Sequence, residues 1–253
     1  MKAKGAGAAT ITFGIVISAG FSFSAERAGD ARVGKLVYQR YCVSCHGAEG
    51  DGAGEFAEWI SPKPRDFRQG TFKCRSTPSG WLPTDADLEK ILKNGLYGTH
   101  MPTWYAIGHR SRTDVIAYIK TFSDRWAKVS DDDPVEVPPE PPNDAASVER
   151  GRALYVSASC DRCHGERGQG DGPSAHDLKD DWGAPIVLRS LLTSHFKCGD
   201  TASDIYRVLL TGLGGTPMPS FADSLKEEEA WDLAHYIVSL GRAGSRRKSN
   251  HDR

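Results

Sequence analysis

The chain has 253 residues, of which 39% are hydrophobic, and its formal net charge is −1. This balance excludes the strongly basic character of a nucleic-acid-binding protein, so no nucleic-acid partner is expected. The length allows two units of about a hundred residues each, and only the first residues contain a stretch apolar enough for a membrane or an export signal.

The N-terminal segment has the order of a secretory signal peptide. Two lysines precede an apolar stretch from Ala8 to Phe23, and the small residues Ser24 and Ala25 follow it. We predict that residues 1–25 are an export signal and that the mature protein is periplasmic. An uncleaved membrane anchor is the alternative, although the stretch is short and rich in Gly, Ser and Ala for a span.

A C-x-x-C-H motif occurs twice, at residues 42–46 and 160–164. Two thiols at this spacing add to the two vinyl groups of one porphyrin, and the adjacent histidine is placed to bind the iron. A C-x-x-C alone also occurs in redox dithiols and zinc sites, but neither copy is paired with a second C-x-x-C. The residues predicted to hold two covalent haem c groups are Cys42, Cys45 and His46, and Cys160, Cys163 and His164.

The segments after the two motifs also repeat. The sequence G-L-Y-G-T-H-M-P at 95–102 corresponds to G-L-G-G-T-P-M-P at 212–219, and the two methionines follow their motif histidines at nearly equal spacing. Apart from Met1, these are the only methionines of the chain. We predict that Met101 and Met218 are the sixth iron ligands, because a thioether raises the reduction potential of haem. A core methionine beside a turn is the ordinary alternative.

Each half resembles a class I cytochrome c domain, and the whole chain resembles the tandem dihaem c-type cytochromes of bacteria. The resemblance covers residues 32–126 and 148–243. It implies an all-α fold of two cytochrome c-like helical haem domains in tandem. In each domain, a first helix carrying a glycine and an aromatic residue would cross a last helix carrying another aromatic residue.

Helical spacing of apolar residues supports the two last helices. We expect the first of them to begin between Ser111 and Asp114, and the second at Ser224 with Glu227 three residues later. His235 has no equivalent in the other half and is expected to be ordinary polar content of its helix. The residues of the expected apolar faces are Val115, Tyr118, Ile119 and Phe122, and Ala230, Leu233, Ala234 and Ile237.

The two units are expected to be joined by an acidic, proline-rich linker at residues 127–147. Such a segment is extended and semi-rigid, so it would keep the units apart or hold them in one orientation. Residues 244–253 are expected to form a basic, solvated tail.

Two cysteines, Cys74 and Cys198, remain after the four haem attachments, and both lie in a Phe-Lys-Cys tripeptide. In an oxidising compartment they are predicted to form a disulfide that ties the two units together. Two separate buried thiols are one alternative, and a thiolate ligand to one iron, as in dihaem thiosulfate dehydrogenases, is another. The related cytochromes have Phe-Lys-Phe before the Arg-Ser-Thr-Pro-Ser-Gly found here at 75–80, so Cys74 departs from that pattern.

The resemblance implies a one-electron carrier and not an enzyme. Its donor would be a dehydrogenase or a quinol oxidoreductase, and its acceptor a terminal oxidase or reductase. It would meet the membrane only through these partners or through an uncleaved signal anchor. The alternatives are a dihaem redox enzyme, similar to a thiosulfate dehydrogenase or a peroxidase, and an electron-transfer subunit of a larger oxidoreductase complex. Enzymatic chemistry at iron would need an open coordination position, which two methionine ligands would close.

Overall fold

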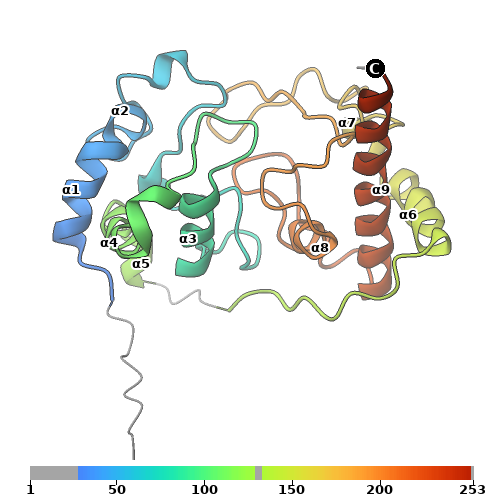
Figure 1. Ribbon diagram of the computed structural model, residues 1–253, viewed down its shortest axis with the longest axis horizontal. Helices are drawn as coiled ribbons and strands as arrows, with labels where there is room; N and C mark the ends of the chain where they lie inside the picture. The colour runs from blue at the N-terminus through green and yellow to red at the C-terminus, as the bar shows by residue number, and fades with distance from the viewer. Residues whose placement is uncertain (1–27, 129–132, 252–253) are drawn as a thin grey trace, which may run out of the picture.

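The computed structural model describes residues 28–128 and 133–251, which form two helical halves side by side (Figure 1). Within these ranges there is no β-strand, only one isolated bridge between Lys179 and Pro185. The all-α expectation is therefore confirmed. None of the helices in the described part is long and apolar enough to cross a membrane. The predicted export signal at residues 1–25 lies outside the described residues.

Both halves contain, in the same order, a first helix, a one-turn helix, a third helix and the helix expected to be the last, and the first half adds another one-turn helix after it. The first half contains α1 (Ala31–Tyr41), α2 (Val43–His46), α3 (Asp85–Asn94), α4 (Gly108–Lys120) and α5 (Arg125–Lys128). The second half contains α6 (Ala145–Ser157), α7 (Asp161–His164), α8 (Ala202–Thr211) and α9 (Glu227–His251). Three single 3-10 turns in the first half cover Ala57–Trp59, Phe67–Gln69 and Tyr105–Ile107.

A glycine allows the first helix of each half to cross the last. A Cβ added at Gly34 of α1 would lie 1.9 Å from the carbonyl oxygen of Asp114 in α4. A Cβ added at Gly151 of α6 would lie 1.9 Å from the carbonyl oxygen of Asp232 in α9. Any side chain at these positions would push the helices apart, so glycine sets how closely they approach. The expected crossing of first and last helices is thus present in both halves.

The apolar faces predicted for the last helices are buried in two separate cores. Val115 is 1% exposed in the first core, and Leu233 and Ala234 are 0% exposed in the second. Each core also includes the aromatic residue of the first helix, Tyr38 or Tyr155. Separate cores fit two units that each fold around their own haem.

The predicted start signals of the last helices are wrong in detail. α4 begins at Gly108, before Ser111, because the preceding 3-10 turn leads directly into the helix. The side chain of Ser224 donates to the carbonyl of Phe221 and does not cap α9. The carboxylate of Glu229 instead accepts a hydrogen bond from the backbone N–H of Lys226 at 2.8 Å.

The linker runs along the two halves without a helix between residues 133 and 144 (Figure 1). Glu140 reaches the second half, where its carboxylate lies 3.3 Å from Nε2 of His235. His235 is 0% exposed, and its Nδ1 lies 2.7 Å from the hydroxyl of Ser147. The expectation of an ordinary polar residue at this position is therefore wrong. α9 continues through His251, into the segment expected to be a tail.

Candidate haem centres

The two C-x-x-C-H motifs lie at the same place in each half, where the first helix ends and a one-turn helix begins. The phenol of Tyr38 donates to the carbonyl of Gly47 at 2.8 Å, and that of Tyr155 donates to the carbonyl of Gly165 at 2.8 Å. Both glycines have a positive φ, of 78° and 80°, which turns the chain sharply after the motif histidine. The buried tyrosine of the first helix thus anchors the loop that follows each predicted haem attachment.

The two motif histidines are both held in a form that can bind a metal ion. Burial lowers the pKa of His46 and of His164, which favours the neutral imidazole that serves as a ligand. Nδ1 of His46 lies 3.1 Å from the carbonyl oxygen of Arg65, so this nitrogen donates and Nε2 remains for iron. Nδ1 of His164 is buried and has no such partner among the described residues. The first histidine is therefore the more firmly oriented of the two.

The environment of the first cysteine in each motif bears on the redox-dithiol alternative. Burial raises the pKa of the Cys42 thiol to about 12 and that of the Cys160 thiol to about 11. A redox dithiol requires a lowered pKa and a stable thiolate. Across residues 28–128 and 133–251, no group of three or more His, Cys, Asp or Glu side chains could hold a metal ion. The raised pKa values of these two thiols are thus unlike those of a redox dithiol.

The third helix of each half is built to present the methionine loop. α3 begins with a reciprocal capping box between Thr84 and Asp87, and α8 with one between Thr201 and Asp204. These boxes satisfy the first backbone N–H groups and fix where each helix starts. Both helices end at a glycine with positive φ, Gly95 and Gly212, and the loop carrying the methionine follows directly.

The methionine loops have the same hydrogen bonds in both halves. The N–H of Leu96 donates to the carbonyl of Met101 at 3.0 Å, and the N–H of Leu213 donates to the carbonyl of Met218 at 3.1 Å. The hydroxyl of the threonine two residues before each methionine accepts a hydrogen bond from the backbone N–H of that methionine. These bonds close each loop and fix the backbone at the methionine.

The residues of the first half fit a covalent haem. The motif residues and Met101 lie around one cavity, and its largely apolar walls include Tyr41, Phe72 and Trp104. In the second half, Cys160 and Met218 both pack against the apolar core of that half. The residues that share the first cavity and would attach or coordinate the haem are Cys42, Cys45, His46 and Met101.

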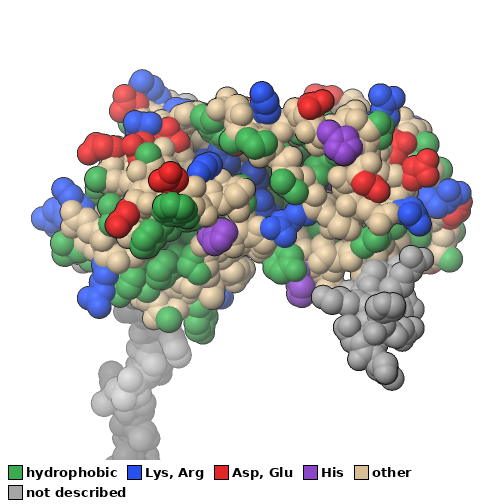
Figure 2. Space-filling model, turned by 90° about the horizontal axis from the view of Figure 1, so that it is seen from above, with side chains coloured by type: hydrophobic (Ala, Val, Ile, Leu, Met, Phe, Trp, Pro, Cys, Tyr) green, Lys and Arg blue, Asp and Glu red, His purple; other side chains and the backbone are tan. Residues whose placement is uncertain are grey.

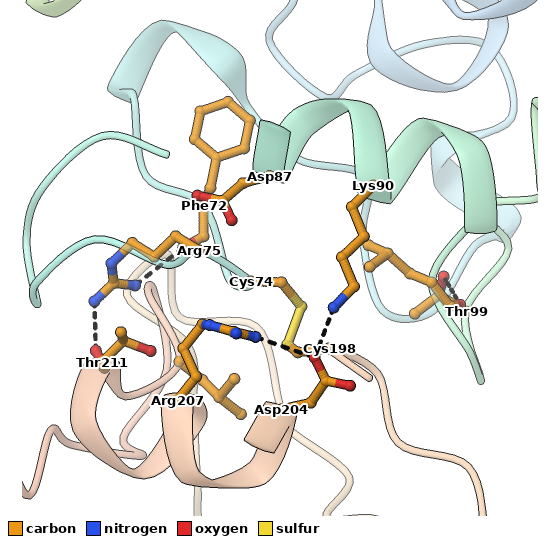
Figure 3. The surroundings of a disulfide bond; sticks show 12 residues. Phe72, Cys74, Arg75, Asp87, Lys90, Thr99, Cys198, Asp204, Arg207 and Thr211 are labelled. Carbon is orange, nitrogen blue, oxygen red and sulfur yellow. Dashed lines mark hydrogen bonds and ion pairs between the residues drawn. A yellow bond between two sulfur atoms is a disulfide. The ribbon is translucent and has the colours of Figure 1, made fainter. Parts of the chain in front are cut away.

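The structure joins Cys74 to Cys198 in a disulfide across the two halves, with 5.3 Å between their Cα atoms (Figure 3). Around it, Lys90 of α3 and Arg207 of α8 both form ion pairs with Asp204, at 2.7 and 3.0 Å. With the two sulfur atoms bonded to each other, neither is a thiolate that could bind iron. This part of the chain therefore connects the halves and is not a third ligand site.

Sequence reasoning missed the cationic side chains at this interface. Arg75 is buried and donates to the carbonyl of Thr211 at 2.6 Å. Arg65 and Arg189 stand at the same distance before the Phe-Lys-Cys tripeptide in each half, so the repeat itself could have identified them as a pair. Their role depends on contacts between the halves, and the residue pattern of a single helix does not predict such contacts.

Comparisons with known proteins agree with this geometry. The family model described as cytochrome c oxidase, cbb3-type, subunit III matches residues 29–119 and 146–237. The cbb3-type cytochrome c oxidase subunit CcoP of Azospirillum brasilense is 24% identical over 226 residues, and that of Azospirillum sp. (strain B510) is 23% identical. Each alignment covers 82% of this chain and 61% of the relative, so the chain spans less than two thirds of their length.

Among solved structures, the chain is similar to a chain of the Kuenenia stuttgartiensis reducing HAO-like protein complex. The identity is 39%, the TM-score is 0.81, and the match covers 83% of this chain and 96% of the other. The similarity therefore includes both halves and their relative placement.

Proposed function

The chain belongs to the family described as cytochrome c oxidase, cbb3-type, subunit III, and we propose that it is the electron-transfer subunit of a larger periplasmic oxidoreductase complex. It is a tandem dihaem c-type cytochrome with two covalently bound haem c groups, as the sequence predicted, because the family match covers both halves. When bound, haem iron supplies reversible one-electron transfer.

The observation that carries the proposal is the solved relative, a chain of similar extent that is part of a named complex. A match over 96% of that chain leaves no large additional domain there to account for its place in an assembly. Of the alternatives expected from the sequence, this observation favours the subunit of a complex over a freely diffusing carrier.

The side chains of this protein would have four tasks in that role. Cys42 and Cys45, and their equivalents in the second half, would attach the porphyrins, while the motif histidines bind iron on one side. Met101 and Met218 would close the other side and raise the potential. The largely apolar walls of the first cavity would keep water away from the haem held there. We therefore assign the protein electron transfer and not substrate chemistry.

The electron donor in this proposal is a dehydrogenase or a quinol oxidoreductase, and the acceptor is a terminal oxidase or reductase. Export through residues 1–25 would place the chain in the periplasm, where haem is attached to C-x-x-C-H motifs. The disulfide suits the same oxidising compartment.

Two measurements test the proposal. Optical and EPR spectra of the purified holoprotein should show two low-spin haems, and ferrous protein should not bind carbon monoxide; a high-spin haem would favour an enzyme. Blue-native electrophoresis of the host's periplasmic and membrane extracts, followed by haem staining and immunodetection, should place the chain in a band well above its own 27.5 kDa. A band at the monomer mass alone would favour a diffusing carrier.

A further inference from the structure

Four cationic side chains meet between the two halves and form pairs related by the repeat. Arg65 and Lys73 come from the first half, and Arg189 and Lys197 stand at the equivalent positions of the second. The disulfide joins the residue that follows each lysine, which brings the two lysines to the same place. We call these four residues the interface cation cluster. Figure 2 shows Lys and Arg side chains gathered between the two lobes of the molecule.

The cluster borders the first haem centre. The cavity lined by the attachment cysteines and by Met101 is also lined by Arg65, Lys73 and Lys197. Lys197 belongs to the second half, so a cation from one half lines the cavity of the other. The first haem centre is therefore incomplete without the second half.

Arg65 and Arg189 each approach the opposite half. The guanidinium of Arg189 donates to the carbonyl of Gly98, in the methionine loop of the first half. A Cβ added at Gly215, the equivalent position of the second loop, would lie 3.0 Å from Nη1 of Arg65. Each arginine thus reaches the methionine loop of the opposite half. Glycine at both loop positions leaves room for this approach.

The protein itself leaves the positive charge of the cluster without direct counter-charges. Among the described residues, neither Lys73 nor Lys197 has a hydrogen-bond or ion-pair partner, and Asp180 attracts Lys73 only at longer range. Burial, together with the neighbouring Lys73, Arg189 and Arg65, lowers the pKa of Lys197 to about 8. Like charges held together away from water cost free energy unless anions join them.

In the described part of the chain, Arg65 forms no ion pair with a carboxylate. The carboxylates that attract it at longer range are Asp180, Asp181 and Asp66. Its guanidinium lies over the ring of Trp182, with 4.3 Å between the Cζ atom and the ring centroid. This contact orients the side chain but supplies no net negative charge. Its donors therefore remain suited to a planar, bidentate anion such as a carboxylate.

We propose that the interface cation cluster binds the propionate carboxylates of the haem groups, and that Lys197 supplies a cation from the second half to the first haem. This rests on the two bound haems and deepens the proposed function. The cluster adjoins the attachment cavity, faces it from both halves and has the charge that carboxylates require. Each half would then help to set the reduction potential of the other's haem, and the disulfide would hold the shared site together.

The test is a potentiometric titration of the intact holoprotein with Lys197→Gln. Losing a cation favours ferric over ferrous haem, so the potential of the first haem should fall. We expect about a tenfold change in its redox equilibrium constant, which is 59 mV for a one-electron couple. Lys197→Arg should restore the potential, and Lys35→Gln, at an exposed position on α1, should leave it unchanged. The two waves are assigned by repeating the titration with Met218→His, which lowers the second potential.

Resonance Raman spectra of the propionate bending modes give a second readout, because these modes respond to hydrogen bonding of the carboxylates. Lys197→Gln should shift them and Lys35→Gln should not. Unchanged modes together with a first potential equal to that of Lys35→Gln would overturn the proposal. So would a wild-type potential that depends on added phosphate at constant ionic strength, because the cluster would then hold an anion from solution. A wild-type protein without two low-spin haems would instead contradict the proposed function.

Discussion

Arg75 of the first half donates a 2.6 Å hydrogen bond to the carbonyl of Thr211, the last residue of α8 in the second half. The same guanidinium donates to the carbonyl of Phe72 in its own half at 3.3 Å. The bond to Thr211 lies at the point where α8 ends and the loop to Met218 begins. One buried cation therefore links the segment beside the disulfide to the methionine loop of the other haem centre.

Replacing this guanidinium should weaken the interface. In Arg75→Leu, the carbonyls of Phe72 and Thr211 lose a charged donor while they stay buried, and we expect a loss of about 1–3 kcal/mol in the free energy of unfolding. Guanidinium chloride titrations of the holoprotein measure this loss. Arg68→Leu is the control, because Arg68 pairs with Asp66 on the exposed surface. If both variants lose the same free energy of unfolding, the hydrogen bond from Arg75 to Thr211 does not stabilise the protein more than a surface ion pair does.

The disulfide should contribute more than any single contact. It closes a sequence separation of 124 residues, and the chain-entropy estimate for such a loop is about 4–5 kcal/mol. The double variant Cys74→Ser, Cys198→Ser should therefore unfold at a clearly lower denaturant concentration than the wild-type protein. Its haem spectra should stay the same, since neither sulfur binds iron.

A thiol count provides the control for this prediction. The unfolded, unreduced wild-type holoprotein should contain no free thiol, because four cysteines carry haem and two are joined to each other. Two reactive thiols would show that Cys74 and Cys198 are separate in the native protein. The stability of the double variant would then be expected to match that of the wild type.

The sequence predicted the features that lie within each half. The motif at 42–46 and its copy at 160–164 follow from local spacing, and so do the buried faces of α4 and α9, because a helix that buries one face must repeat with its turn. The glycine at each helix crossing followed from the resemblance to class I cytochrome c domains. The boundaries were less certain, as the true start of α4 at Gly108 shows. A 3-10 turn entering a helix has no distinctive residue pattern.

Most contacts between the halves were outside the reach of this reasoning. The exception is the disulfide of Cys74 and Cys198, which was predicted from the repeated Phe-Lys-Cys tripeptide and is present in the structure. Two alternatives to it stayed open, because spacing along the chain says nothing about distance through space. His235 was expected to be ordinary polar content of its helix, yet it is buried between Ser147 and the linker residue Glu140. Such positions depend on how loops and a linker fold back. The repeat left a trace of the interface in the matching offsets of Arg65 and Arg189, as it did in the two Phe-Lys-Cys tripeptides.

Acid should destabilise the second half through Asp232. Its carboxylate accepts hydrogen bonds from Arg150 at 2.7 and 2.8 Å and from Ser147 at 2.6 Å. Burial alone raises the pKa of Asp232, but these bonds outweigh it and hold the pKa below its ordinary value of 3.8. A lowered folded-state pKa contributes stability that is present above about pH 4 and is lost as the pH falls through the folded value.

The comparison that tests this uses Asp232→Asn. Its unfolding free energy should change less between neutral pH and about pH 3 than that of the wild type, because the titrating group is gone. Asp223→Asn, at an exposed position of the same half, should keep the wild-type pH dependence. Equal acid sensitivity in Asp232→Asn and wild type would assign the loss to other carboxylates.

Replacing the predicted methionine ligand of the second half should open its haem and leave the other haem unchanged. Met218→Ala removes the thioether in the second half, where Pro217 stands before it and offers no ligand. The ferrous form of that haem should then bind carbon monoxide, and its potential should fall because the sulfur no longer favours ferrous iron. The first haem, in the same molecule, is the internal control for both measurements.

The first half should respond differently, because His100 stands before Met101 and lines the same cavity. In Met101→Ala, this imidazole can move to the iron, so we expect a low-spin haem with a lower potential and little carbon monoxide binding. Adding His100→Ala should open the site, while His100→Ala alone should keep the wild-type spectrum. If the double variant neither binds carbon monoxide nor changes its potential, Met101 is not the ligand. If Met101→Ala alone binds carbon monoxide as readily as Met218→Ala, the loop holds His100 away from the iron.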